Sequence, residues 1–107
     1  MSDNAGRKDD AGKTAAHLFS VPAFLGTSRI LAFGANKYEP RNWEKGILYS
    51  RVYSALLRHM MAWWQCEELD EETGESHLLH AMCCVMFLAH FSESGGYETF
   101  DDRPTPR

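Results

Sequence analysis

The fold is most clearly indicated by residues 50–92, SRVYSALLRHMMAWWQCEELDEETGESHLLHAMCCVMFLAHFS. Apolar residues in its first half recur every three or four positions, which is the spacing of one face of a helix. Gly74 interrupts this pattern, and Ser76 is a good N-cap for a second helix that is apolar on most sides. We therefore predict two antiparallel helices, 51–70 and 77–91, joined by a short acidic turn.

Around this hairpin the sequence predicts a small all-α helical bundle. Residues 23–36 have the pattern of a further helix, and residues 36–48, with proline, asparagine and glycine, have that of a loop. No stretch shows a convincing strand pattern. The polar ends, 1–12 and 93–107, are expected to be flexible, so the folded domain is 13–92.

A domain of this length buries little apolar surface by itself. The helix predicted at 77–91 has so few polar residues that it belongs at the centre of a bundle or at a subunit interface. We therefore expect a homo-oligomer, a dimer or a tetramer.

The composition excludes several classes of protein. The chain has 107 residues and a formal net charge of −4, whereas nonspecific binding to DNA or RNA needs a basic surface, so no nucleic-acid partner is expected. No apolar run approaches the roughly 18 residues of a membrane span. No secretory signal opens the sequence, and the expected location is the cytoplasm.

The cysteines are typical of a reducing compartment. Cys83 and Cys84 are adjacent within an apolar stretch, and Cys66 stands apart. This spacing gives neither a disulfide framework nor a zinc site, so we expect reduced, buried thiols.

The two halves of the chain carry opposite charge. Residues 1–58 hold nine basic and five acidic residues, a formal +4, and residues 59–107 hold two basic and ten acidic residues, a formal −8. Mutual attraction of the halves is one interpretation. The other is a ligand that uses both signs, such as a nucleoside polyphosphate bound with Mg²⁺.

Six carboxylates crowd the end of the first helix of the hairpin. If that helix runs to residue 70, Glu67, Asp70 and Glu71 lie on one side of it, where their like charges repel one another. A divalent cation would offset this repulsion, and oxygen ligands suit Mg²⁺ or Mn²⁺. The alternative is a solvated acidic helix end.

Three histidines are predicted to converge on this acidic cluster. His77 and His80 lie one turn apart on the second helix, and His59 lies two turns before Glu67 on the first. They suit a metal ligand, a general base for water or a phosphate donor. Each is also compatible with a hydrogen-bonded core residue.

The loop 34–46 combines cations, aromatic rings and an amide. It lacks the spacing of a P-loop. Lys37, with Arg41 or Lys45, offers positive charge for phosphates. Tyr38 or Trp43 offers a ring that can stack on a base, and the amide of Asn42 can read a base edge. The alternative is a structural loop whose aromatic rings fill the core.

Three segments together carry a family resemblance: FGANKYEPRNWEKGI, SALLRHMMAW and EELDEETGESHLLHA. Over residues 12–91 the chain resembles the phage dATP/dGTP diphosphohydrolase (MazZ-type) family, grouped with MazG-like nucleotide pyrophosphohydrolases. The resemblance implies an oligomeric, all-α, MazG-like bundle. It also implies Mg²⁺-dependent cleavage between the α- and β-phosphates of a purine nucleoside triphosphate, with dGTP giving dGMP for the synthesis of 2-aminoadenine nucleotides. A phage-encoded protein of this kind would act in the host cytoplasm.

The resemblance also implies which residues form the site. The positions that match the family pattern are Lys37, Tyr38, Asn42, Trp43, Arg58, His59, Glu67, Asp70, Glu72, His77 and His80. One departure stands out. MazG proteins have E-x-x-D on the helix that follows E-E-x-x-E, whereas this chain has His77-x-x-His80 there, unless Glu67-x-x-Asp70 is itself the E-x-x-D element.

We thus expect a nucleoside triphosphate pyrophosphohydrolase with Mg²⁺ (or Mn²⁺) as cofactor. The expected catalytic residues are His59, Glu67 and His77, and the expected metal ligands are Glu67, Asp70 and Glu71. The expected nucleotide-binding residues are Lys37, Tyr38, Asn42, Trp43, Arg58 and His80.

Two other functions fit the same residues. The lost acidic pair on the second helix favours a non-catalytic phage protein that sequesters a nucleotide signal of host defence. A structural helical hairpin that oligomerises or binds a partner protein would leave the acidic cluster merely solvated.

Overall fold

A computed structural model describes residues 5–106 of the chain. Within them are three α-helices, α1 (Val21–Lys37), α2 (Tyr49–Trp64) and α3 (His77–Ser94). Short 3₁₀ turns lie at Ala16–Leu18, Asn42–Lys45 and Glu98–Phe100. The described part contains no named strand, which confirms the all-α fold.

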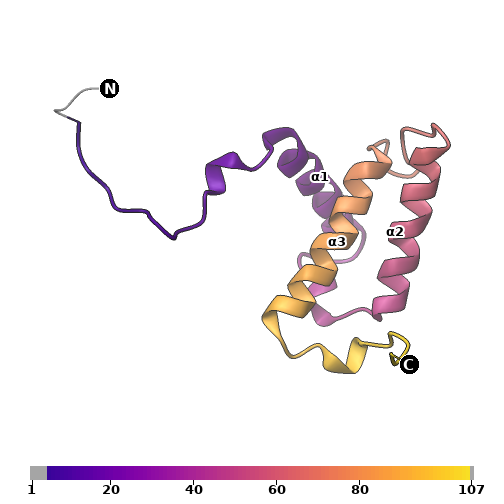
Figure 1. Cartoon of the computed structure of the whole chain (residues 1–107). Coiled ribbons are helices and arrows are strands. Elements are labelled where there is room, and N and C mark those ends of the chain that lie inside the picture. The colour runs from indigo at the N-terminus through magenta and orange to yellow at the C-terminus, as the bar shows by residue number, and fades with distance from the viewer. Residues whose placement is uncertain (1–4, 107) are drawn as a thin grey trace.

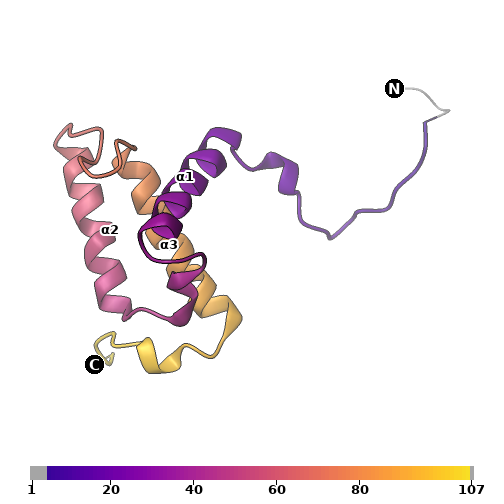
Figure 2. The same ribbon diagram turned by 180° about the vertical axis from the view of Figure 1, so that it is seen from behind.

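Helix α3 is the centre of the molecule. It lies between α1 and α2, packs against both, and runs antiparallel to α2, as Figure 1 and the reverse view in Figure 2 show. This arrangement confirms the predicted hairpin. It also explains why α3 is apolar nearly all round: it has neighbours on two sides, and Cys84 and Phe91 join Val52 of α2 in the buried core.

Helix α1 begins two residues before the predicted start at 23 and ends one residue after the predicted end at 36. The side chain of Ser20 accepts a hydrogen bond from the backbone N–H of Ala23, which caps the first turn. The helix continues through Gly34 to Lys37, so the glycine does not end it. Helices α1 and α2 scarcely touch each other, and the loop between them covers one end of the space that separates them.

The prediction that the first hairpin helix reaches residue 70 is wrong, because α2 ends at Trp64. Cys66 adopts a left-handed backbone with φ 67°. Its N–H donates to the carbonyl of Trp63, and the N–H of Glu67 donates to that of Ala62. These two bonds form a Schellman motif, which satisfies the last carbonyls of the helix and turns the chain away.

The C-terminal segment returns to the start of α2. The hydroxyl of Tyr97 donates to the carbonyl of Glu44, and the backbone N–H of Ser50 donates to Asp102 at 2.8 Å. Phe100 lies so close to Gly46, which has φ 104°, that a Cβ there would overlap its ring. The flexibility of 1–12 and 93–107 stays a prediction, and residues 1–4 and 107 lie outside the part of the chain that the structure describes.

None of the helices in residues 5–106 has the length and apolar character needed to cross a membrane.

Candidate functional site

The acidic segment between α2 and α3 is a closed loop rather than a helix end. Asp70 and Glu75 pair through the backbone at 2.9 Å, and Leu69 forms an isolated antiparallel bridge with Ser76. One carboxylate oxygen of Asp70 accepts the backbone N–H groups of Glu72 and Thr73, at 2.9 and 3.0 Å. The loop thus fixes the orientation of the Asp70 carboxylate.

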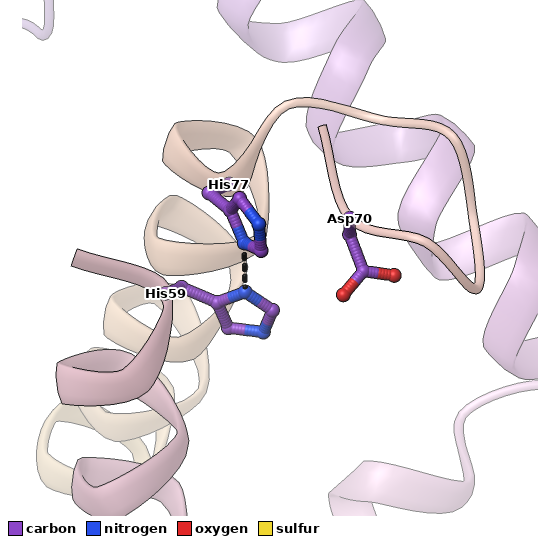
Figure 3. Close-up of side chains that lie close together, drawn as sticks. All are labelled: His59, Asp70 and His77. Atoms are coloured by element: carbon purple, nitrogen blue, oxygen red, sulfur yellow. Dashed lines mark hydrogen bonds between the residues drawn. The ribbon is translucent and has the colours of Figure 1, made fainter. Parts of the chain in front are cut away.

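A chain of hydrogen bonds links Glu67 to two histidines. The Nε2 of His77 lies 2.8 Å from the carboxylate of Glu67, and its Nδ1 lies 2.9 Å from the Nδ1 of His59 (Figure 3). His77 is buried, with 5% of its surface exposed, and Glu67 holds it from the solvent side. The hairpin therefore brings His59, Glu67 and His77, the three expected catalytic residues, into one hydrogen-bonded chain.

His80 and Asp70 lie beside this chain. The ring of His80 stacks on that of His59, with centroids 4.5 Å apart and planes at 10°. The Nε2 of His80 lies 2.7 Å from the hydroxyl of Thr73 and 3.8 Å from Asp70. Figure 3 shows the Asp70 carboxylate pointing toward the ring of His59.

The surroundings of His59 and His80 favour their neutral form. Burial, then the neighbouring charges of His80 and His77, hold the pKa of His59 below its usual value. Burial likewise lowers the pKa of His80, although Asp70 opposes the shift. For Asp70, partial burial opposes ionisation, but the N–H of Thr73 and nearby His80 outweigh it and keep the pKa of the carboxyl below its usual value. Neutral imidazoles beside an ionised carboxylate can accept a proton or bind a cation.

A cavity of about 750 Å³ opens between α1, the loop after it and α3. It is lined by five of the six residues expected to bind the nucleotide: Lys37, Tyr38, Asn42, Trp43 and His80. His80 belongs to both the cavity and the histidine cluster, so the two features adjoin. The sixth residue, Arg58, lines a neighbouring hollow of about 680 Å³. The two spaces share Ile47, Cys84 and Phe87 in their lining, and we call them together the groove.

The aromatic residues of the loop differ in their surroundings. Trp43 stacks on Phe87 with centroids 4.7 Å apart, so one of its faces is committed to packing. Tyr38 is 65% exposed and lies beside the Nζ of Lys37. Tyr38 is therefore the ring of the two that is free to stack on a base.

The cations of α1 and its loop are bound to carboxylates. Lys37 lies 3.4 Å from Glu72 and Arg29 lies 2.8 Å from Glu75, which ties the acidic loop to α1. Sequence reasoning missed Thr73 and Glu75 as parts of the site. Both lie in the segment 71–76, which the sequence predicted only as a short acidic turn joining the two helices.

The expected ligand set Glu67, Asp70 and Glu71 does not share a helical face, because these residues follow the end of α2. Among residues 5–106, the group within metal-binding range is instead His59, Asp70 and His77, one donor atom from each within 4.8 Å of the others. Asp70 belongs to both sets. The carboxylates of the acidic loop offer oxygen donors that fit Mg²⁺, and the imidazoles beside Asp70 add nitrogen donors that Mn²⁺ and later transition metals tolerate better.

The cysteines form no disulfide in residues 5–106. Cys83 and Cys84 are buried as expected, and burial raises the pKa of the Cys83 thiol to about 12. Cys66 is exposed, so the expectation that all three thiols are buried is wrong for this one. It lies at the turn that ends α2, where its side chain points away from the core.

The fold and the site define a class: small all-α proteins with a histidine–carboxylate cluster at the edge of a groove lined by polar and aromatic side chains. The chain belongs to the family described as dATP/dGTP diphosphohydrolase, N-terminal, whose model matches residues 3–103. This confirms the family resemblance drawn from the sequence.

A relative in Salmonella phage PMBT28, named dATP/dGTP diphosphohydrolase, is 34% identical to the chain over 98 residues. The match covers 92% of this chain and 33% of the relative, so the chain spans about a third of that protein's length. No solved structure matches the chain.

Proposed function

We propose that the chain is a Mg²⁺- (or Mn²⁺-) dependent pyrophosphohydrolase of phage nucleotide metabolism, active in the host cytoplasm. Its substrate is a purine (deoxy)nucleoside triphosphate of the dGTP or dATP type, and its products are the monophosphate and pyrophosphate. The observation that carries the proposal is the position of the histidine–carboxylate cluster at one end of the groove. Membership of a family named for dATP/dGTP diphosphohydrolase supports the choice of substrate.

The nucleoside occupies the cavity beside the α1 loop. Tyr38 stacks on the base, the amide of Asn42 reads a base edge, and Trp43 closes the apolar wall. Lys37 and His80 lie at the margins from which the phosphates extend toward the cluster. In this proposal the α-phosphate lies near His59.

Glu67, His77 and His59 act as a general-base chain. With Glu67 ionised, Nε2–H of His77 donates to it, so Nδ1 of His77 accepts the Nδ1–H of His59. The lone pair of His59 then lies on Nε2. A water attacks the α-phosphorus, its proton passes to this Nε2, and the bond to the β-phosphate breaks to release pyrophosphate.

Asp70, already oriented by its loop, would hold the divalent cation, and the acidic-loop carboxylates Glu67 and Glu71 would turn toward it as the cation binds. The chemistry supplied by such a cation, when bound, is neutralisation of the charge on the phosphate oxygens. Arg58 contributes a positive charge from α2 to the same phosphates.

The test is incubation with Mg²⁺ or Mn²⁺ and a panel of NTPs and dNTPs, with products separated by chromatography. We expect monophosphate plus pyrophosphate, with purine deoxynucleotides cleaved fastest. Glu67→Gln should lower kcat about 10- to 100-fold, because the partner that fixes the tautomer of His77 loses its charge. Glu68→Gln, an exposed neighbour in the same loop, is the matched control and should keep the wild-type rate.

Intact nucleotides that co-elute with the protein would overturn the enzyme and favour the sequestering function. Absence of both binding and hydrolysis would leave the structural hairpin.

A further inference from the structure

The two walls of the groove differ in available positive charge. On the wall formed by α1 and its loop, the two cations that line the cavity are paired with carboxylates, Lys37 with Glu72 and Arg41 with Glu44. Two further cations of α1 and its loop are paired as well, Arg29 with Glu75 and Lys45 with Glu39. An incoming anion must compete with these carboxylates. This wall is therefore a poor site for a highly charged ligand.

Helix α2 forms the other wall and carries two arginines that are not paired with carboxylates in the described part of the chain. Within residues 5–106, neither Arg51 nor Arg58 makes an ion pair. Both line the 680 Å³ hollow, seven residues apart and thus about 10 Å apart along the helix axis. Seven residues are nearly two turns, so the two side chains leave the helix on the same side.

The hydroxyl of Ser54 lies between the two arginines. It accepts a hydrogen bond from Nη1 of Arg58 at 3.0 Å and lines the same hollow. At the far end, the hydroxyl and backbone N–H of Ser50 are both bound to the carboxylate of Asp102. The negative charge of Asp102 limits the favourable region to the stretch from Arg51 to Arg58.

This hollow adjoins the histidine cluster and the nucleoside cavity. Arg58 directly precedes His59 in α2, and Cys84 and Phe87 of α3 line both the hollow and the cavity. A ligand whose base lies in the cavity can therefore extend its charged end into the hollow without leaving the groove.

We propose that Arg51, Arg58 and Ser54 form the polyphosphate subsite of the groove, which receives the β- and γ-phosphates and holds them as the leaving pyrophosphate. The inference rests on the proposed function, because it assigns one end of the same substrate. Guanidinium groups bind phosphate oxygens through paired N–H donors, and two of them on one helix suit an extended anion with several phosphates. Arg51 enters the site through the structure alone, since no sequence motif singles it out.

The test is calorimetric titration of inorganic tripolyphosphate into the full chain at low salt. We expect Arg51→Gln and Arg58→Gln each to weaken binding about tenfold or more, and the double variant to weaken it further. Arg51→Lys should fall between wild type and Arg51→Gln, because lysine keeps the charge but loses the planar fork. Arg7→Gln removes the same charge from the N-terminal segment, whose ribbon extends away from the three helices in Figure 1. Arg7 lines neither space of the groove, so this variant should bind as wild type does.

Several results would overturn the subsite. These are no binding by wild type, unchanged affinity in the double variant, equal weakening in Arg7→Gln, or tighter binding of a single-stranded oligonucleotide than of tripolyphosphate. Thermal melts would verify that the variants are folded.

Failure of the subsite and failure of the proposed function are distinguishable. Arginine-dependent tripolyphosphate binding without hydrolysis of any nucleotide would keep the subsite and overturn the enzyme. Normal hydrolysis with unchanged KM in Arg51→Gln would keep the enzyme and overturn the subsite.

Discussion

Individual hydrogen bonds determine which ring nitrogen of each histidine carries a proton and which can accept one. An imidazole cannot donate from both nitrogens while it is neutral, so the bond from His77 to Glu67 determines which nitrogen of His59 carries a proton. The role of each ring therefore follows from the contacts of its neighbour. The sequence shows three histidines but not this order.

Asp70 has a structural and an electrostatic role that two substitutions separate. Asp70→Asn keeps an oxygen that can accept the N–H groups of Glu72 and Thr73 but removes the charge. We expect it to melt within a few degrees of wild type and to hydrolyse nucleotide about 100-fold more slowly. Asp70→Ala should in addition lose about 1–2 kcal/mol of unfolding free energy, because the loop N–H groups lose their acceptor.

Urea unfolding and steady-state kinetics on both variants measure the two effects. A wild-type rate in Asp70→Asn would show that the charge of Asp70 is not used.

The lowered pKa values of His59 and His80 predict a pH-dependent stability. Both groups titrate near 6.5 in the unfolded chain and lower in the folded one. Below pH 6.5 the unfolded chain binds more protons, so the stabilisation is complete above that pH and is lost as pH falls through the folded pKa values. The melting temperature should therefore fall between pH 7 and pH 5.

Thermal melts across that range check the direction of the shift. His80→Gln should flatten the profile, whereas His17→Gln, in the exposed N-terminal segment, should leave its slope unchanged. Equal slopes in wild type and His80→Gln would contradict the interpretation.

At the scale of elements, the end of α2 positions the whole site. If the helix continued to residue 70, its carboxylates would follow the helix axis away from α3. Because it ends at Trp64, the chain doubles back and His77 meets Glu67 across the hairpin. The ending is hard to foresee because a cysteine occupies the left-handed position that glycine usually fills.

That strained position predicts a stabilising substitution. A left-handed backbone costs a non-glycine residue about 1–2 kcal/mol, and the greater freedom of glycine in the unfolded chain offsets part of the gain. Cys66→Gly should therefore raise the free energy of unfolding by roughly 0.5–1 kcal/mol. Chemical denaturation measures it, with Cys66→Ser as the control that keeps a Cβ. A less stable Cys66→Gly would show that the thiol makes a compensating contact.

In the whole molecule, one face of α2 is left uncovered by residues 5–106. Tyr53, Leu57, Met61 and Trp64 follow helical spacing on the side away from the core, and Trp64 is 79% exposed. A continuous exposed apolar stripe of this kind is typical of an interface. We propose that a second copy of the chain covers it, since a stripe on one helix is self-complementary about a twofold axis.

Trp64→Glu and Leu57→Glu should then lower the molar mass in solution from that of an oligomer to that of a monomer. Light scattering after size exclusion measures it, with Ser92→Glu, an exposed position at the end of α3, as the control. A monomeric wild type would overturn the proposal.

The all-α class and the α2–α3 hairpin follow from the local sequence. Helical periodicity and capping are local, so the two helices and their antiparallel pairing follow from nearby residues. The approach of His59 to His77 follows in turn, because a hairpin brings the C-terminal part of one helix beside the first turn of the next, whereas the position of Glu67 depends on where α2 ends.

Three features emerge only in the folded molecule: the end of α2, the order of hydrogen bonds among the histidines, and the different states of the cations on the two walls of the groove. The cations on the α1 wall are paired with carboxylates, and within residues 5–106 the arginines on the α2 wall are not. Each depends on contacts between residues distant in sequence. Lys37 and Glu72, for example, form an ion pair although they are 35 positions apart. Whether Arg51 has a carboxylate partner likewise depends on which distant residues the fold brings near it. The sequence assigned the phosphates to Lys37 and Arg58 alike, whereas the ion pairs of the folded molecule favour the arginines of α2, because an ion pair leaves little field for a further ligand.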